Sequence, residues 1–103
     1  MTSTLKLADD LFPGLLNGEK TCTIRSGRRD IQLGPLVFES VSGELNQVTV
    51  EVISVIYMRA GDIPDDLARA DGARDGTELL DAMKRFYPDL KSESEITAVI
   101  FHQ

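Results

Sequence analysis

The residues whose types and spacing could carry out chemistry are concentrated in one segment, Gly18-Glu19-Lys20-Thr21-Cys22-Thr23-Ile24-Arg25. A threonine hydroxyl is a weak nucleophile until a neighbouring base takes its proton, and a partly desolvated lysine amine can act as that base. An arginine close by could hold a developing oxyanion. The segment therefore predicts general-base or nucleophilic chemistry, although solvated cations at the start of a strand would explain the same residues more simply.

The geometry of this segment sets a condition on that chemistry. Residues 21–25 are rich in Thr and Ile, which predicts a strand. Because successive side chains of a strand point to opposite faces, its first, third and fifth residues share one face. Lys20 precedes Thr23 by three residues and would point to the other face of a straight strand. We therefore expect a bend just after Gly18 if the two side chains are to meet.

Length and charge limit the classes of ligand. The chain has 103 residues, 42% hydrophobic and 27% charged, which predicts a single domain over residues 1–103. Its formal net charge is −6, whereas proteins that wrap nucleic acid usually carry an excess of basic residues. Four cations still fall within ten residues, at Lys20, Arg25, Arg28 and Arg29. One positive site in an acidic protein favours a small or single-nucleotide ligand over a long polymer.

Other chemistries find little support in the sequence. The single cysteine, Cys22, excludes an intramolecular disulfide, and its place beside Ile24 predicts a buried, inert thiol. His102 has no matching metal ligands, and there is no Gly-rich phosphate loop, so we expect no metal and no cofactor. No apolar run approaches the roughly 18 to 20 residues that span a bilayer, and the first residues do not resemble a signal peptide. We expect a cytoplasmic protein without a membrane partner.

The elements that must position the segment follow from periodicity and capping residues. Helices are predicted at residues 8–17, 62–70 and 77–87, and strands at residues 21–25, 36–41, 47–58 and 96–101. Gly18 should end the first helix, Thr77 should cap the last one and Pro88 should stop it. A turn is predicted at residues 42–46, and a change of phase at residues 53–57 predicts a bulge. Since helices and strands do not alternate as βαβ units, we expect an α+β fold: a curved, mainly antiparallel sheet with short helices at its edges.

The motif Gly18-x-Lys20-x-x-Thr23-x-Arg25 resembles the GxKxxTxR signature of ASCH domains, which are PUA-like β-barrels linked to RNA and nucleoside chemistry. The short helix before the motif agrees with that pattern. So does an Ala70-Asp71-Gly72 segment that precedes a helix ending in Phe86-Tyr87-Pro88. With the closing strand, the resemblance extends over nearly the whole chain and implies a PUA-like β-barrel.

In length the chain is most similar to the small N4-acetylcytidine amidohydrolases among these proteins, which are described with a Lys, a Thr and a Glu. The resemblance assigns the catalytic Lys to Lys20, the Thr to Thr23 and the acid to Asp71, with Asp75 or Glu78 as alternatives for the acid. The substrate-binding residues that we expect are Arg25, Gly18, Thr21 and Arg28.

The resemblance implies metal-independent cleavage of the N4-acyl amide of N4-acetylcytidine, or a related N4-acylated cytidine, to cytidine and carboxylate. Attack by Thr23 and attack by a water that Lys20 activates are both allowed. The expected partner is a small modified nucleoside. The protein itself is expected to be a monomer or a weak dimer. The alternatives are an RNA-binding module of the same type, in which the four cations grip phosphates, and a ribonuclease that uses the same cleft. The acidic net charge suits a nucleoside better than RNA.

Overall fold

The computed structural model describes residues 3–43 and 47–103. Its elements, in chain order, are β1 (Ser3–Leu7), η1 (Asp9–Leu11), α1 (Phe12–Leu16), β2 (Cys22–Ser26), β3 (Gly34–Ser40), β4 (Val48–Arg59), η2 (Ala60–Asp62), α2 (Asp65–Asp71), α3 (Gly76–Phe86) and β5 (Glu95–His102), where η denotes a 3-10 helix. The turn predicted at residues 42–46 lies partly outside the described residues. None of the described helices is long and apolar enough to cross a membrane.

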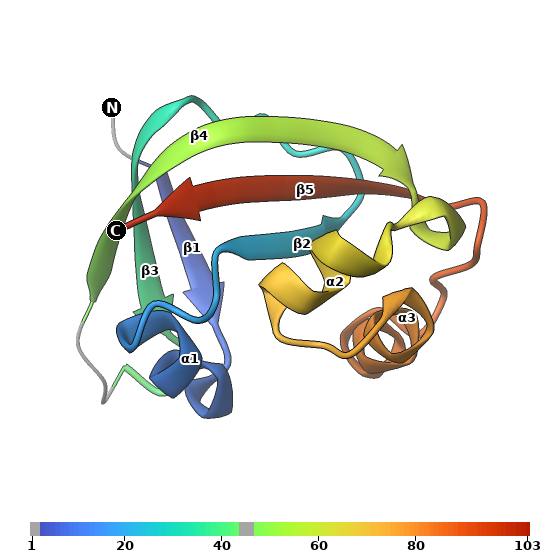
Figure 1. Cartoon of the computed structure of the whole chain (residues 1–103), viewed down its shortest axis with the longest axis horizontal. Coiled ribbons are helices and arrows are strands. Elements are labelled where there is room, and N and C mark those ends of the chain that lie inside the picture. The colour runs from blue at the N-terminus through green and yellow to red at the C-terminus, as the bar shows by residue number, and fades with distance from the viewer. Residues whose placement is uncertain (1–2, 44–46) are drawn as a thin grey trace.

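The five strands form one curled sheet in the order β1-β3-β4-β5-β2, with the helices at its open side (Figure 1). β1 pairs with β3 in parallel, and the other three pairings are antiparallel. The predicted α+β fold with a curved, mainly antiparallel sheet is thus confirmed. β1 was not predicted from the sequence, because its short Ser-Thr-Leu-Lys-Leu stretch gains a strand conformation mainly from pairing with β3.

The bend in the sheet lies in β4, where the sequence predicts a bulge. β4 pairs with β3 up to Val52 and with β5 from Glu51 onward, and the register with β5 shifts between Val52 and Ser54. A bulge bends a strand and increases its local twist. The predicted bulge is therefore confirmed. It allows one long strand to pair with β3 before the bend and with β5 after it.

Two hydrophobic cores lie against the sheet. The first joins the sheet to α1 and includes Phe12, Leu15, Phe38 and Phe101. The second joins the sheet to α2 and α3 and consists mainly of these residues: Cys22, Ile24, Ala68, Leu79, Met83, Ile96 and Ala98. β2 lies at one edge of the sheet, between the two groups of helices (Figure 1). The strand that carries the motif therefore lies where the two helical groups meet.

The helix ends agree in part with the expected caps. Gly18, with a φ of 83°, follows α1 in the left-handed conformation, as predicted. The predicted cap at Thr77 is wrong. α3 begins at Gly76, and the side chain of Asp75 caps it by accepting a hydrogen bond from the backbone N–H of Glu78. Thr77 thus lies inside the first turn, where its hydroxyl cannot occupy the capping position.

Candidate functional site

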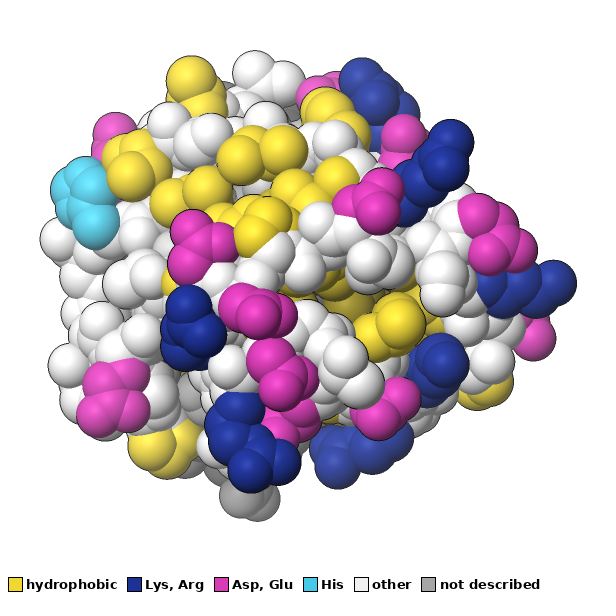
Figure 2. Space-filling view, turned by 45° about the vertical axis from the view of Figure 1, so that its right-hand side comes forward, with side chains coloured by type: hydrophobic (Ala, Val, Ile, Leu, Met, Phe, Trp, Pro, Cys, Tyr) yellow, Lys and Arg dark blue, Asp and Glu magenta, His cyan; other side chains and the backbone are white. Residues whose placement is uncertain are grey.

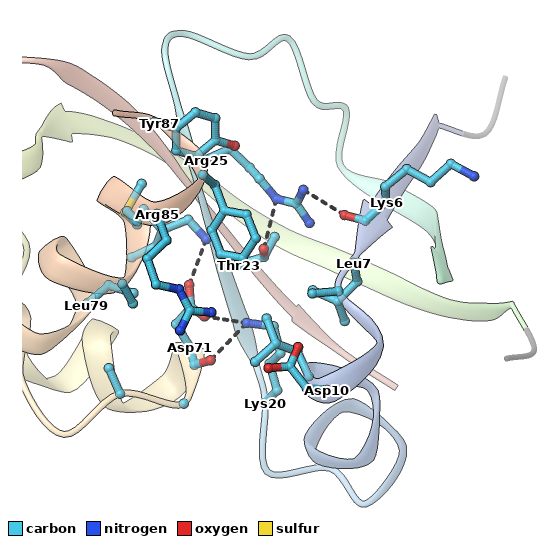
Figure 3. A pocket seen from close by; sticks show the side chains of 18 of the residues that line it. Lys6, Leu7, Asp10, Lys20, Thr23, Arg25, Asp71, Leu79, Arg85 and Tyr87 are labelled. Carbon is cyan, nitrogen blue, oxygen red and sulfur yellow. Dashed lines mark hydrogen bonds and ion pairs between the residues drawn. The ribbon is translucent and has the colours of Figure 1, made fainter. Parts of the chain in front are cut away.

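A cavity of about 300 Å³ opens beside β2. β1 and η1 line one side of it, and the end of α2 and one face of α3 line the other. Lys20, Thr23 and Arg25 of the motif all point into it (Figure 3). The structure therefore brings the main residues of the predicted site together in one cavity.

Lys20 and Asp71 form a buried ion pair at one end of this cavity. Their side chains are only 4% and 12% exposed, and Lys20 Nζ lies 2.5 Å from Asp71 Oδ1. Lys20 Nζ also donates to the backbone oxygen of Asp71 at 2.9 Å. The second carboxylate oxygen of Asp71 accepts the backbone N–H of Ile24 at 2.9 Å. Both oxygens of the acid are thus engaged, and the amine is held in a fixed position.

Backbone contacts produce the bend that this arrangement needs. After Gly18, the N–H of Lys20 donates to the oxygen of Gly14 at 3.0 Å. The N–H of Thr21 then donates to the oxygen of Ala70 at 2.9 Å, which fixes β2 beside the end of α2. Gly18 and Thr21 do not line the cavity, although we expected both to bind substrate. Their observed contacts position Lys20 through the backbone.

Arg25 and Thr23 form a second linked pair, further along β2. Arg25 Nε donates to Thr23 Oγ1 at 3.1 Å, and Arg25 Nη1 donates to the backbone oxygen of Lys6 in β1 at 2.8 Å. The guanidinium therefore links the two edge strands of the sheet. Burial lowers the pKa of Arg25, and the charges of Tyr87 and Asp71 oppose this shift. Arg25 Nη2 is buried and has no hydrogen-bond partner in the described part of the chain.

Lys20 and Thr23 share the cavity without bonding to each other. Within the described residues, the hydrogen-bond partners of Lys20 Nζ belong to Asp71, and Thr23 Oγ1 is bonded to Arg25. Figure 3 shows Thr23 between the Lys20–Asp71 pair and the guanidinium of Arg25. A small molecule in the cavity would thus lie beside an amine, a hydroxyl and a guanidinium group along one strand.

The alternatives for the acid are engaged elsewhere. Asp75 caps α3, as described above. Glu78 lines the cavity, but its carboxylate pairs with Arg74 Nε at 2.7 Å. The hydrogen bonds from Arg74 lower the pKa of Glu78. Of the three acids that the sequence left open, the structure places Asp71 against Lys20.

Arg28 is not brought to the cavity, although we expected it to bind substrate. Its guanidinium carbon lies 3.8 Å from the centre of the Tyr57 ring, and its Nη1 lies 3.7 Å from Glu95. Arg29 is also held by the loop itself, because its Nε donates to the oxygen of Ser26 at 2.9 Å. The basic cluster of the sequence is therefore divided between the cavity and the loop after β2.

Several cavity residues were not predicted as part of the site. Leu79, Met83 and Tyr87 line it from α3 or its end, and Asp10 lines it from η1. The hydrophobic stripe of the last helix was visible in the sequence, but the pattern cannot show that a cavity remains beside it. Asp10 therefore adds a carboxylate to the cavity, and α3 supplies most of its apolar wall.

Cys22 is fully buried, as predicted, and belongs to the core between the sheet, α2 and α3. Burial and the negative charge of Asp71, opposed by the charge of Lys20, together raise the pKa of its thiol to about 12. A thiol that keeps its proton is a poor nucleophile. Cys22 thus takes no part in the chemistry of the cavity.

Comparison with known proteins identifies the fold. Neither a protein-family model nor a curated protein matches the sequence. The structure is similar to that of an ASCH domain from Lactobacillus crispatus, with a TM-score of 0.77 and 16% identity over 98% of this chain and 78% of that one. It is also similar to an ASCH protein from Zymomonas mobilis, with a TM-score of 0.72 and 11% identity over 97% of this chain and 66% of that one. The molecule is thus a PUA-like α+β half-barrel. More narrowly, it has the fold of the ASCH domains.

Proposed function

We propose that this protein is a metal-independent amidohydrolase that cleaves the N4-acyl amide of N4-acetylcytidine, or of a related N4-acylated cytidine. The observation that carries the proposal is the buried Lys20–Asp71 pair, in one cavity with Thr23 and an unpaired nitrogen of Arg25. The motif that resembles the signature of ASCH domains supplies three of these four residues. The substrate class that we propose for the enzyme is suggested by that resemblance.

The size of the cavity supports a small substrate. Ligand pockets typically measure roughly 300 to 1,000 Å³, and this cavity, at about 300 Å³, lies at the lower limit. Leu79, Met83 and Tyr87 offer an apolar wall to the faces of a planar ring. A single modified nucleoside fits this description better than an extended strand.

The contacts favour attack by water over attack by Thr23. Thr23 Oγ1 accepts a hydrogen bond from Arg25, so its own proton is free to be donated into the cavity. We infer that Thr23 donates to the oxygen of the acyl group and stabilises the oxyanion as it forms. Lys20 is held by Asp71 rather than by Thr23, and a water in the cavity would be its reaction partner.

The reaction then needs one proton cycle through Lys20. Transfer of a proton from Lys20 Nζ to Asp71 Oδ1, across their 2.5 Å contact, leaves a neutral amine. This amine takes a proton from the water as the water oxygen bonds to the acyl carbon. When the bond from that carbon to N4 breaks, the proton passes from Nζ to N4. The products are cytidine and the carboxylic acid, and Asp71 then returns its proton to Lys20 Nζ, which restores the starting ion pair.

An absorbance assay of N4-acetylcytidine conversion to cytidine tests the proposal. We expect turnover by the intact protein, with or without a chelator, and a loss of about 10²- to 10⁴-fold in Lys20→Ala because the general base is gone. The matched control is Lys84→Ala, an exposed lysine of α3 outside the cavity, which should keep full activity. Full hydrolysis by Lys20→Ala would overturn the proposal. An acetyl group trapped on Thr23 in the quenched reaction would instead restore the covalent route.

The alternative functions gain less support. Arg28 contacts Tyr57 and Glu95, and Arg29 is bonded to the backbone of Ser26, so two of the four clustered cations are engaged outside the cavity. On the face drawn in Figure 2, Lys and Arg side chains are interspersed with Asp and Glu, and hydrophobic side chains form a band along the top of the view. A continuous basic track, which RNA binding or RNA cleavage would use, is not visible on that face. RNA affinity that falls steeply with salt would revive these alternatives.

A further inference from the structure

We propose that Arg25 determines the base specificity of the site by binding the C2 carbonyl oxygen of a pyrimidine ring. This inference rests on the proposed function, because it takes the substrate to be an N-acylated nucleobase whose amide lies at Lys20. It goes beyond that function by stating which ring the enzyme selects and which atom it recognises. Its basis is Nη2, the one guanidinium nitrogen that lacks a partner in the described part of the chain.

The guanidinium of Arg25 is held rigidly before any ligand binds. Nε is bonded to Thr23 of the same strand, and Nη1 is bonded to the backbone of Lys6 in the opposite edge strand. Nη2 is buried and unpaired within the described residues. An unmade hydrogen bond on a buried, charged group is unfavourable, and most such groups in proteins have a partner. A ligand acceptor in the cavity would satisfy this nitrogen.

The two bonds already made restrict the kind of acceptor. Arginine binds carboxylate and phosphate groups through a fork of two neighbouring nitrogens. Each such fork of Arg25 includes Nη2 and either Nε or Nη1. Nε has given its single N–H to Thr23, and Nη1 has given one of its two N–H groups to Lys6. The fork of Nε and Nη2 is therefore taken, and Nη2 is the guanidinium nitrogen left to bind a single oxygen, such as a ring carbonyl.

The order of groups along β2 indicates which carbonyl this is. Lys20 and Asp71 lie at one end of the cavity, Thr23 in the middle and Arg25 at the other end (Figure 3). Thr23 and Arg25 lie two residues apart on the same face of β2, and the Arg25 side chain reaches back until its Nε is 3.1 Å from Thr23 Oγ1. In cytosine, the N4 and O2 atoms stand at the two ends of one ring edge. An acyl amide at Lys20 and Thr23 thus directs O2 toward Arg25, whereas adenine carries only a C–H at its C2 position.

A substitution in the substrate tests this contact without altering the protein. Sulfur is a weaker acceptor than oxygen, so we compare kcat/KM for N4-acetylcytidine and N4-acetyl-2-thiocytidine. A lost hydrogen bond to a charged donor predicts about tenfold or greater preference of the wild type for the oxygen compound. Arg25→Gln should hydrolyse the two compounds at similar kcat/KM. Arg28→Gln, which alters an arginine outside the cavity, should keep the preference.

Each outcome decides between the two proposals. If the wild type hydrolyses both compounds equally well, or if Arg25→Gln keeps the preference, the role of Arg25 is overturned and the amidohydrolase stands. Arg25→Lys keeps the buried charge and replaces the Gln variant if that variant fails to fold. If the wild type hydrolyses neither compound, the amidohydrolase fails, and calorimetric binding of cytidine and 2-thiocytidine then decides about Arg25. Tighter binding of cytidine that disappears in the variant retains the inference, and equal or absent binding overturns it.

Discussion

Because the Lys20–Asp71 pair is buried, we expect substitutions of its two members to have strongly coupled effects on the free energy of unfolding. Removing one member of a buried ion pair costs about 3–5 kcal/mol, because the remaining charge stays in a poorly solvated site. Lys20→Met would leave the carboxylate of Asp71 with only the N–H of Ile24, and Asp71→Asn would leave an uncompensated ammonium. We therefore expect each single substitution to lower the free energy of unfolding by about 3 kcal/mol. In a domain of this size that corresponds to a fall of about 12–24 °C in Tm.

The double variant, Lys20→Met with Asp71→Asn, should be more stable than the sum of the two changes predicts. It removes both charges together, and an amide oxygen at position 71 can still accept the N–H of Ile24. We expect a coupling energy of about 2–3 kcal/mol. Urea unfolding followed by circular dichroism measures it, since the chain has no tryptophan. The matched control cycle uses Lys6 and Glu39, an equally short but exposed ion pair, for which we expect much weaker coupling.

Turnover in the same variants separates structure from chemistry. If Lys20 is the base, the double variant regains stability and remains inactive. Additive effects of the two substitutions would refute our account of the buried pair. Hydrolysis of N4-acetylcytidine by the double variant would refute the role of Lys20, whatever the stability measurements show.

Two further predictions concern the thiol and the helix cap. Because burial raises the pKa of Cys22 to about 12, the stability that the neutral thiol contributes is complete below pH 9 and is lost as the pH rises toward 12. Relative to Cys22→Ala, the wild type should lose up to about 1.4 kcal/mol of unfolding free energy per pH unit in that window. Urea unfolding of both proteins at pH 8, 9 and 10 measures this loss. A difference in unfolding free energy between the two proteins that stays constant over these pH values would contradict the prediction. Asp75→Ala should destabilise the protein by about 1 kcal/mol, whereas Thr77→Ala should have little effect. The reverse order in thermal melts would contradict the observed cap.

The sequence predicted what is determined locally. The order of Gly18, Lys20, Thr23 and Arg25 marked the segment that enters the cavity, and the change of phase in β4 marked the bulge. Both are properties of a few neighbouring residues and of strand periodicity. The position of the Arg28 side chain depends instead on contacts with distant residues, since Tyr57 and Glu95 approach it only in the folded sheet. The strand β1 escaped prediction for the same reason, because its ladder is made with β3.

The reach of Asp71 shows how tertiary contacts determine the geometry of the candidate site. An aspartate is one methylene shorter than the glutamate that the resemblance led us to expect, and the sequence could not say whether it would meet Lys20. In the structure, the backbone of the preceding residue, Ala70, is already bonded to Thr21 beside the lysine. The end of α2 is thereby drawn against the start of β2, and Gly72, with a φ of 112°, turns the chain away directly afterwards. A longer acid at this position would have to fold back or displace the helix end, so the short side chain and the close backbone belong together.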